Sequence, residues 1–236
     1  MKICLYTAIF GDYETLKPPE KIDGLDYICF TDNPDLKSDD WKIIYIEKDN
    51  NVPPAVSYKK IKCLSHNYLP DYDYTIWLDA NFVIKDKDYV NFLFKNFKSD
   101  KILLYKHFCL AGFPRNCIYQ EGIYSLTIPK YSKEKILPQL NEYKNLHNYP
   151  ENNGLYQSGF LLRNNRYLDV IEFNKLWFKE IMKFGMIYPQ CQVSLPFTLW
   201  KLNISFNIIP DENIWNTQRY EITVHGNNEK FKPAYV

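Results

Sequence analysis

A carboxylate and a carboxamide stand two residues apart in the apolar segment IWLDANFVI, from Ile76 to Ile84. Asp79 and Asn81 interrupt what otherwise has the composition of a buried strand. On an extended backbone the two side chains project to the same side. Their oxygens are hard ligands suited to Mg²⁺ or Mn²⁺, which take further ligands from substrate phosphates. The pair indicates a metal site beside a phosphorylated ligand, and the alternative is a strand-end turn.

Two lysines are spaced so that they can join such a ligand. Lys59 and Lys62 are three residues apart in a segment with helical spacing of apolar residues, and they therefore share a face. One or both can neutralise the charge of a diphosphate. A solvated lysine face is the commoner reason for this spacing.

The segment YTAIFGDYE, from residue 6 to residue 14, combines small residues with a glycine and a tyrosine. Backbone groups in such a loop can contact a base edge, and a tyrosine can stack on the base. Asp32, at the end of ICFTD, can accept a hydrogen bond from the base or the ribose, or it can form an ordinary Asx turn with Asn33 and Pro34. The other candidates on the nucleotide side are Thr7, Ala8, Phe10 and Tyr13.

The elements that would position these residues follow from short apolar runs that alternate with longer mixed segments. Runs rich in β-branched and aromatic residues predict strands at 2–10, 26–32, 41–47, 75–84 and 101–107. The segment 57–69 has helical spacing between the third and fourth of these strands. This order favours an α/β sheet, in which ligands bind beyond the carboxyl ends of the strands. Asp79 and Asn81 fall at such an end.

The second half of the chain is richer in expected helices. The segments 133–145 and 166–185 predict helices, and 154–164 between them predicts a strand bounded by glycines. No linker rich in Pro, Gly or Ser divides the 236 residues. We therefore expect a single domain over 1–236.

Composition limits the classes of function. Lys+Arg 29 against Asp+Glu 28 gives a net charge of +1, so bulk electrostatics do not indicate a nucleic-acid partner. No apolar run reaches the roughly 20 residues of a transmembrane helix, and we expect a cytoplasmic protein. The six cysteines contain no C-x-x-C pair, which favours buried thiols over disulfides or zinc ligands.

The segment IWLDANFVI resembles the Asp-x-Asp segment of GT-A glycosyltransferases, which ends a strand and holds the metal of a nucleotide-sugar. Asn81 replaces the second Asp. YTAIFGDYE, ICFTD, YKKIKCLSH, WLDAN, RNCIYQEG and QVSLPFTLWK follow in the order of the glycosyltransferase-like family whose plant members include turgor-regulation and mucilage-related proteins. The resemblance, from about Leu5 to Lys201, implies a GT-A-like (Rossmann-like) α/β fold with a mixed, mostly parallel sheet flanked by helices. It also places a basic residue at Lys62.

A second resemblance lies in the tail. VHGNNEKFKP, from residue 224 to residue 233, is similar to the His-x-x-Gly-x-x-Lys-Pro ending of glycogenin-like GT-A enzymes, although here the glycine directly follows His225. The resemblance implies that His225 is a third metal ligand and that Lys230 or Lys232 contacts the diphosphate. An ordinary surface histidine is the alternative for His225.

Two further segments of the family pattern concern the sugar. Arg115 and Glu121 flank NCIYQ, where they contact the donor sugar or form a structural ion pair with each other. The turn before FLLRN resembles the small-residue turn where GT-A enzymes place donor sugar and acceptor. Its residues are Gln157, Ser158 and Gly159.

The catalytic candidates depend on the stereochemical route. Relatives usually carry Arg-Asp-Gln before the Ser of QVSLPFTLWK, whereas this chain has Gln190, Cys191 and Gln192 and so lacks that carboxylate. An inverting route needs a carboxylate base near the acceptor hydroxyl, for which Glu121, Asp211 and Glu212 are available. A retaining route can use the departing phosphate. The catalytic candidates are Glu121, Gln192 and Asp211.

The resemblance therefore implies a metal-assisted glycosyltransferase that moves a sugar from a nucleotide-sugar, expected to be a UDP-sugar, to a glycan or other hydroxyl acceptor. The expected cofactor is Mn²⁺ or Mg²⁺. Two other functions fit the same residues. One is a metal-dependent hydrolase of a lipid or sugar substrate, and the other is a nucleotide-sugar-binding module without turnover.

Overall fold

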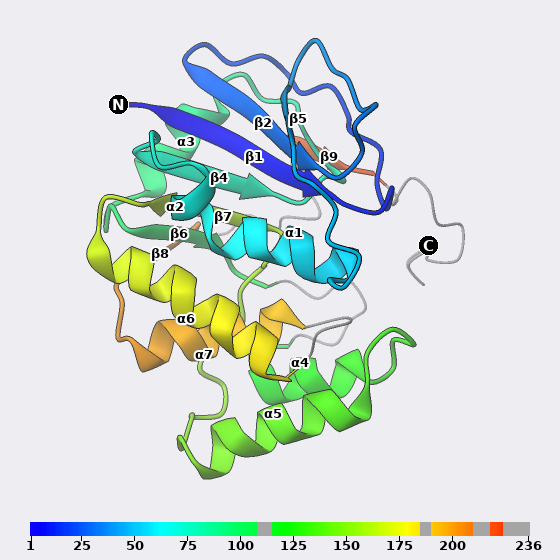
Figure 1. Cartoon of the computed structure of the whole chain (residues 1–236). Helices are drawn as coiled ribbons and strands as arrows, with labels where there is room; N and C mark the ends of the chain where they lie inside the picture. Colours follow the sequence, from blue (N-terminus) through cyan, green and yellow to red (C-terminus); the bar gives the residue numbers. More distant parts are fainter. Residues whose placement is uncertain (108–114, 185–189, 210–217, 224–236) are drawn as a thin grey trace.

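The computed structural model describes residues 1–107, 115–184, 190–209 and 218–223. In these ranges seven strands form one sheet in the order β3-β2-β1-β4-β7-β6-β8 (Figure 1). Strand β7 is antiparallel to both of its neighbours, and the other pairs are parallel. The predicted mixed, mostly parallel sheet is thus confirmed. The strands are β1 (Ile3–Ile9), β2 (Leu25–Thr31), β3 (Lys42–Tyr45), β4 (Tyr74–Leu78), β6 (Ile102–Tyr105), β7 (Phe160–Asn164) and β8 (Asn207–Ile209).

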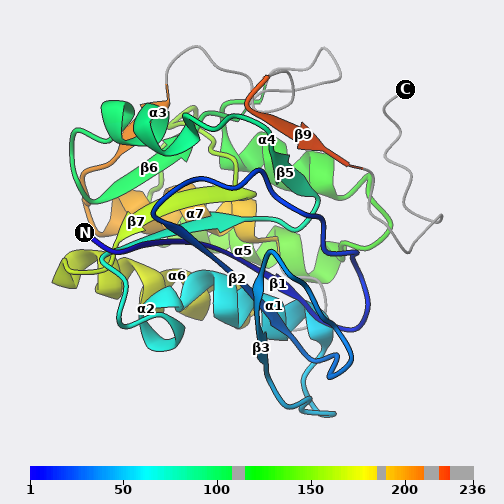
Figure 2. The same cartoon turned by 90° about the horizontal axis from the view of Figure 1, so that it is seen from above.

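Both faces of this sheet are covered (Figures 1 and 2). One face packs against α1 (Pro54–Cys63), α2 (Ser65–Tyr68), α6 (Leu168–Phe184) and α7 (Cys191–Lys201). The other face packs against α3 (Tyr89–Asn96) and a small antiparallel sheet of β5 (Phe82–Ile84) and β9 (Tyr220–Ile222). A third apolar cluster joins α7 to α4 (Ile118–Ser125) and α5 (Lys133–Asn145). No helix in the described ranges has the length and apolar character needed to cross a bilayer.

Strand β1 shows why the central strands are apolar on both sides. Leu5 and Ile9 pack in the cluster on the α3 face, whereas Tyr6 and the following Phe10 pack in the cluster on the α1 face. Side chains alternate between the two faces of a strand, so a sheet covered on both sides needs apolar residues at every position.

The predicted strand over 75–84 is in fact two strands in different sheets. The backbone N–H of Phe82 donates to the carbonyl of Asp79 at 3.0 Å, which closes a turn through Ala80 and Asn81. The expectation that Asp79 and Asn81 share a side because the backbone is extended is therefore wrong. Polar residues at the end of β4 redirect the chain from the main sheet to β5.

A buried arginine ties α1 to the sheet and to α6. Arg163 on β7 is 0 % exposed, and its guanidinium donates to the carbonyls of Cys63 at 2.9 Å and Lys62 at 2.7 Å. It also donates to Asn174 Oδ1 at 2.6 Å and to the hydroxyl of Tyr6. Its partners are neutral oxygens, two of which are carbonyls at the carboxyl end of α1, where cations are favourable.

Replacing Arg163 with Met should destabilise the fold strongly. The substitution leaves several buried acceptors without a donor, and each costs about 1–3 kcal/mol, so we expect a loss of roughly 3 kcal/mol or more in the free energy of unfolding. Chemical denaturation measures this loss. Arg166→Met is the control, because Arg166 has a side chain that is 63 % exposed and should barely move the unfolding midpoint. Equal stability of both variants would contradict the assigned role.

Candidate functional site

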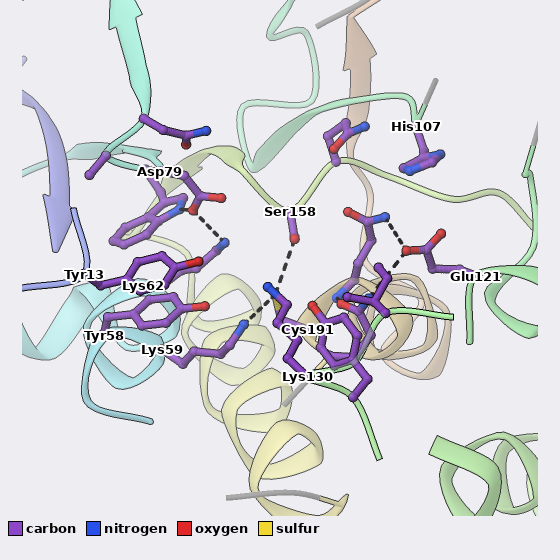
Figure 3. Close-up of a pocket in the computed structure, with 18 of the residues that line it drawn as sticks. Tyr13, Tyr58, Lys59, Lys62, Asp79, His107, Glu121, Lys130, Ser158 and Cys191 are labelled. Atoms are coloured by element: carbon purple, nitrogen blue, oxygen red, sulfur yellow. Dashed lines mark hydrogen bonds and ion pairs between the residues drawn. The ribbon is translucent and has the colours of Figure 1, made fainter. Parts of the chain in front are cut away.

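A cavity of about 350 Å³ opens where the parallel strands end (Figure 3). Ala8 lines it from β1, Asp79 follows β4, and His107 follows β6. Strand β7 is antiparallel to its neighbours β4 and β6, so it begins at this edge of the sheet. Gln157 and Ser158, which precede β7, therefore also line the cavity. The cavity therefore occupies the place where open α/β sheets bind ligands.

Asp79 is held by two donors on one oxygen. Its Oδ1 accepts from Lys62 Nζ at 3.1 Å and from Trp77 Nε1 at 2.8 Å, while Oδ2 receives no hydrogen bond from the described residues. The Lys62 side chain is 2 % exposed and that of Asp79 is 38 % exposed. Burial raises the pKa of Asp79, but the ammonium of Lys62 and the Trp77 bond more than offset it and hold that pKa below its usual value. Burial lowers the pKa of Lys62, but Asp79 and Cys191 together outweigh it and leave that pKa raised.

Asn81 also keeps one oxygen unused. Its side-chain Nδ2 donates to the backbone carbonyl of Thr223 at 3.4 Å. The backbone carbonyl of Asn81 accepts from Thr223 N at 2.7 Å. No hydrogen bond from the described residues reaches its Oδ1. Oδ2 of Asp79 and Oδ1 of Asn81 are thus two hard oxygens beside one cavity, a donor set that suits Mg²⁺ or Mn²⁺. In the described ranges no three His, Cys, Asp or Glu side chains gather as a metal cluster.

Lys59 makes a second pair across the same cavity. Its side chain is buried, and Nζ lies 3.1 Å from the sulfur of Cys191, whose Sγ is 3.3 Å from Ser158 Oγ. Figure 3 shows Lys59 and Ser158 converging on Cys191 from two sides. The interpretation of Lys59 and Lys62 as a solvated face is wrong, because both side chains point into the protein toward anionic partners.

Aromatic rings line the side of the cavity nearest α1. Tyr13 and Tyr58 lie beside Lys62 in Figure 3. The small side chain of Ala8 also lines the cavity. Gly11 lies two residues before Tyr13 and has a φ of +67°. A Cβ added to Gly11 would lie 2.8 Å from Pro54, so any other residue at this position would be strained. The predicted placement of Ala8 and Tyr13 at a ligand site agrees with this geometry.

Three other nucleotide-side candidates do not line the cavity. Thr7 is buried in β1, and Phe10 packs in the core with Tyr6. Asp32 accepts from the backbone N–H of Gly11 at 2.8 Å and so fixes the loop that carries Tyr13. The side chains of Thr7 and Phe10 are committed to the core because they lie on a strand that is covered on both faces.

A polar network forms the far wall. Arg115 Nε donates to Glu121 Oε2 at 2.6 Å, and Gln192 Nε2 donates to Glu121 Oε1 at 3.1 Å. Gln190 caps α7 by accepting from the backbone of Gln192 and also donates to Ser125 Oγ at 2.9 Å. Burial raises the pKa of Glu121, and Arg115 opposes it without cancelling it. Arg115 and Glu121 therefore contact each other, one of the two expected outcomes, and both also line the cavity.

Two polar groups near this wall have no hydrogen-bond partner among the residues that the structure describes. Gln157 Nε2 and His107 Nδ1 are these groups, and both residues are buried and line the cavity. Burial, with the nearby Arg115, lowers the pKa of His107 to about 4, so its imidazole is neutral at physiological pH. His107 was not a candidate from sequence, because a single histidine after an apolar run carries no spacing signal.

Gly159 lies beside Asp79. Its carbonyl accepts from Asp79 N at 3.0 Å, and an added Cβ would lie 3.1 Å from Asp79 Oδ2 and 3.3 Å from a ring carbon of Phe82. A glycine here keeps Oδ2 accessible. Of the remaining sequence candidates, four lie outside the described residues: Asp211, His225, Lys230 and Lys232.

Comparison with known proteins adds a family and a fold. No curated protein matches the chain. A solved apo structure described as the WbbM bifunctional glycosyltransferase superposes with a TM-score of 0.50 at 9 % identity, over 88 % of this chain. The chain spans 38 % of the length of that protein, and at this identity the likeness shows the fold.

The model of the TOD1/MUCI70 glycosyltransferase-like domain matches residues 1–221, which include every described residue of the cavity. This match agrees with the family resemblance found in the sequence motifs. The chain belongs to the TOD1/MUCI70 glycosyltransferase-like family.

Proposed function

We propose that the chain transfers a sugar from a nucleotide-sugar donor, with UDP as the expected nucleotide, to a glycan or other hydroxyl acceptor. The observation that carries this proposal is the Lys62–Asp79 pair at the edge of the cavity, with one unused oxygen on Asp79 and one on Asn81. A cation and a pair of hard oxygens side by side suit a diphosphate that arrives with a divalent ion.

Asp79 and Asn81 are the residues that would hold Mn²⁺ or Mg²⁺, with His225 kept as a predicted third ligand. The bound ion would stabilise negative charge on the departing nucleoside diphosphate. Two protein ligands are enough for such an ion, because it commonly takes the rest from phosphates and water. Lys62 stays beside Asp79 and prevents the carboxylate from being protonated when the ion is absent.

The lysines supply charge without an ion. Lys59 and Lys62 are buried on one face of α1, so their ammonium groups are already desolvated and positioned before a ligand arrives. Fixed charges of this kind stabilise charge that develops in a transition state without reorganisation. We assign the diphosphate to this side of the cavity, and the base to Tyr13 and Tyr58 next to it.

The opposite wall suits the sugar and the acceptor. Gln157 and His107 offer uncharged polar atoms that no described residue bonds, and Gln192 adds an amide bound to Glu121. Buried unpaired polar groups discriminate strongly for ligands that supply the missing hydrogen bond. Glu121 stays the candidate base for an inverting route, and its bonds to Arg115 and Gln192 fix the direction in which its carboxylate faces.

A thermal-shift screen of nucleotide-sugars, with and without Mn²⁺, tests the donor assignment. A ligand that binds only the folded state raises the unfolding midpoint by mass action. A UDP-sugar should raise it more with Mn²⁺ than without. If no nucleotide raises the midpoint in either condition, the donor assignment fails.

Product analysis then separates transfer from the two other functions. A transferase should hydrolyse its donor slowly until an acceptor hydroxyl is added. Rapid turnover without acceptor would identify a hydrolase, and binding without product across a broad acceptor screen would identify a binding module.

Asp79→Asn should abolish the Mn²⁺-dependent part of the thermal shift while keeping the shape of the side chain. The amide can still accept from Trp77, whereas the charged metal ligand is lost. Asn81→Asp should tighten Mn²⁺ by about tenfold, because it adds a charged oxygen. Asp35→Asn, at an exposed loop position, is the control and should behave as the parent. An unchanged Mn²⁺ response in Asp79→Asn would remove Asp79 from the metal role.

Lys62→Met should weaken binding of a nucleoside diphosphate by roughly 10- to 100-fold and leave binding of the free nucleoside nearly unchanged. Lysine contributes to phosphate binding as a charge and adds little to base recognition. Calorimetry with UDP and uridine measures the difference. Lys60→Met is matched to it on the same helix, because Lys60 is exposed. An equal loss for UDP and uridine would contradict a phosphate contact.

A further inference from the structure

We propose that Cys191 is a reactive thiolate in the wall of the cavity and a site of covalent modification by low-molecular-weight disulfides. Cys191 lines the cavity and lies between Lys59 Nζ at 3.1 Å and Ser158 Oγ at 3.3 Å (Figure 3). A thiol in contact with a buried ammonium is stabilised as the thiolate, which is the nucleophilic form. The proposed transfer reaction makes no use of this group.

The backbone of Cys191 adds to this stabilisation. Cys191 is the first residue of α7, an 11-residue helix capped by Gln190. The N–H groups in the first turn of a helix have no intrahelical partner and carry the positive end of the helix dipole. The helix N-terminus and the ammonium of Lys59 therefore both stabilise negative charge on the sulfur of Cys191.

Charged and titratable groups face Cys191 from several elements. Lys59, Lys62 and Tyr58 come from α1, Ser158 from the turn before β7, and Lys130 and Tyr131 from the segment before α5. Burial raises the pKa of the Cys191 thiol, but Lys59 and Lys62, with the Ser158 hydrogen bond, more than offset this effect and lower the pKa to about 7. The charge of Asp79 on the same side is matched by Lys62.

Other cysteines of the chain provide an internal contrast. Cys4, Cys29 and Cys63 are buried in the apolar core, where burial raises their pKa values, to about 12 for Cys29 and Cys63. They lie outside the cavity. Reactivity at neutral pH should therefore concentrate on Cys191 rather than spread over these thiols.

The cavity has room and a polar contact for a small reagent. Its volume of about 350 Å³ is within the range of small-molecule sites, and the buried amide of Gln157 lines it. Within the described ranges Gln157 Nε2 has no hydrogen-bond partner, and the residue is 5 % exposed, so a ligand in this cavity could accept from this donor.

The modification is thiol–disulfide exchange. The Cys191 thiolate attacks one sulfur of a small disulfide such as oxidised glutathione, a new S–S bond forms, and the old S–S bond breaks. The second half leaves as a thiolate and takes a proton from water. Cys191 gains an S–S bond, the attacked sulfur exchanges its partner, and the leaving sulfur is reduced to a thiol, so the small disulfide is the oxidant and no other is needed. An adduct of this size occupies part of the cavity, and its effect on donor binding rests on the proposed function.

Alkylation of the full chain by iodoacetamide, with peptide mapping by mass spectrometry, measures the reactivity between pH 5.5 and 9. The rate at Cys191 should rise with pH and reach half its maximum near pH 7, because only the thiolate reacts. Cys4, Cys29 and Cys63 should stay unlabelled while the protein is folded. Lys59→Met should cut the Cys191 rate at pH 7 by about tenfold and move the midpoint toward about 8.5. Lys60→Met, changed at an exposed position one residue along, should leave the rate as in the parent.

A midpoint at or above about 8.5 in the parent, or equal rates in Lys59→Met and Lys60→Met, would overturn the proposal. Oxidised glutathione at pH 7 should modify Cys191 and leave Cys4, Cys29 and Cys63 unmodified, and Cys191→Ser should lose that adduct; an adduct at one of those three core cysteines and none at Cys191 also overturns it. The adduct should suppress the Mn²⁺–UDP thermal shift. If the unmodified protein shows no such shift while Cys191 still reacts as described, the proposed function fails and the modification site stands.

Discussion

The placement of the cavity depends on one buried guanidinium. Arg163 leaves β7 and binds the carbonyl oxygens of Lys62 and Cys63, which fixes the last turn of α1 against the sheet. The same Lys62 is held at its other end by Asp79. An arginine cannot lose its charge to lower the cost of burial, so bonds from both of its terminal nitrogens to oxygens offset that cost, and two of these bonds set the position of the helix end. Lys59, almost one turn earlier, is positioned by the same constraint.

Two lysines of α1 therefore face two acidic groups of different kinds. Lys62 is paired with the carboxylate of Asp79, which stays ionised over the whole physiological range because its pKa is lowered. Lys59 lies beside the sulfur of Cys191, whose pKa the two lysines lower. In the proposal for Cys191, protonation of the thiol would leave the charge of Lys59 uncompensated and would favour an anionic ligand in the cavity. The thiolate would instead compete with that ligand for the same ammonium.

Residue type and spacing were enough to predict that Asp79, Asn81 and Lys62 share one site, since they stand out against apolar surroundings and all three line the cavity. The alternation of strands and helices likewise gave the α/β class. The alternation of side chains along β1 could have excluded either Thr7 or Ala8 from the site. The two residues are adjacent on the strand, so their side chains face opposite sides of the sheet. The burial of Lys59 could not be predicted, because its partner Cys191 lies 132 residues away and only the packed α1 and α7 bring them together. The turn at Asp79–Asn81, which the sequence offered only as the alternative, is confirmed; one long strand was the first prediction because apolar runs stand on both sides.

The charge pattern of the cavity also orients the ligand. Cationic side chains that are held in buried pairs lie on the α1 side, whereas the wall near β6 offers His107 and Gln157 as polar but uncharged groups. His107 stays neutral because burial and Arg115 both oppose its protonation. A diphosphate gains most where ammonium groups are already desolvated, and a sugar hydroxyl gains most where a neutral donor or acceptor lacks a partner. In the proposed reaction, the diphosphate of the donor would therefore lie toward Lys62 and its sugar toward His107 and Gln157.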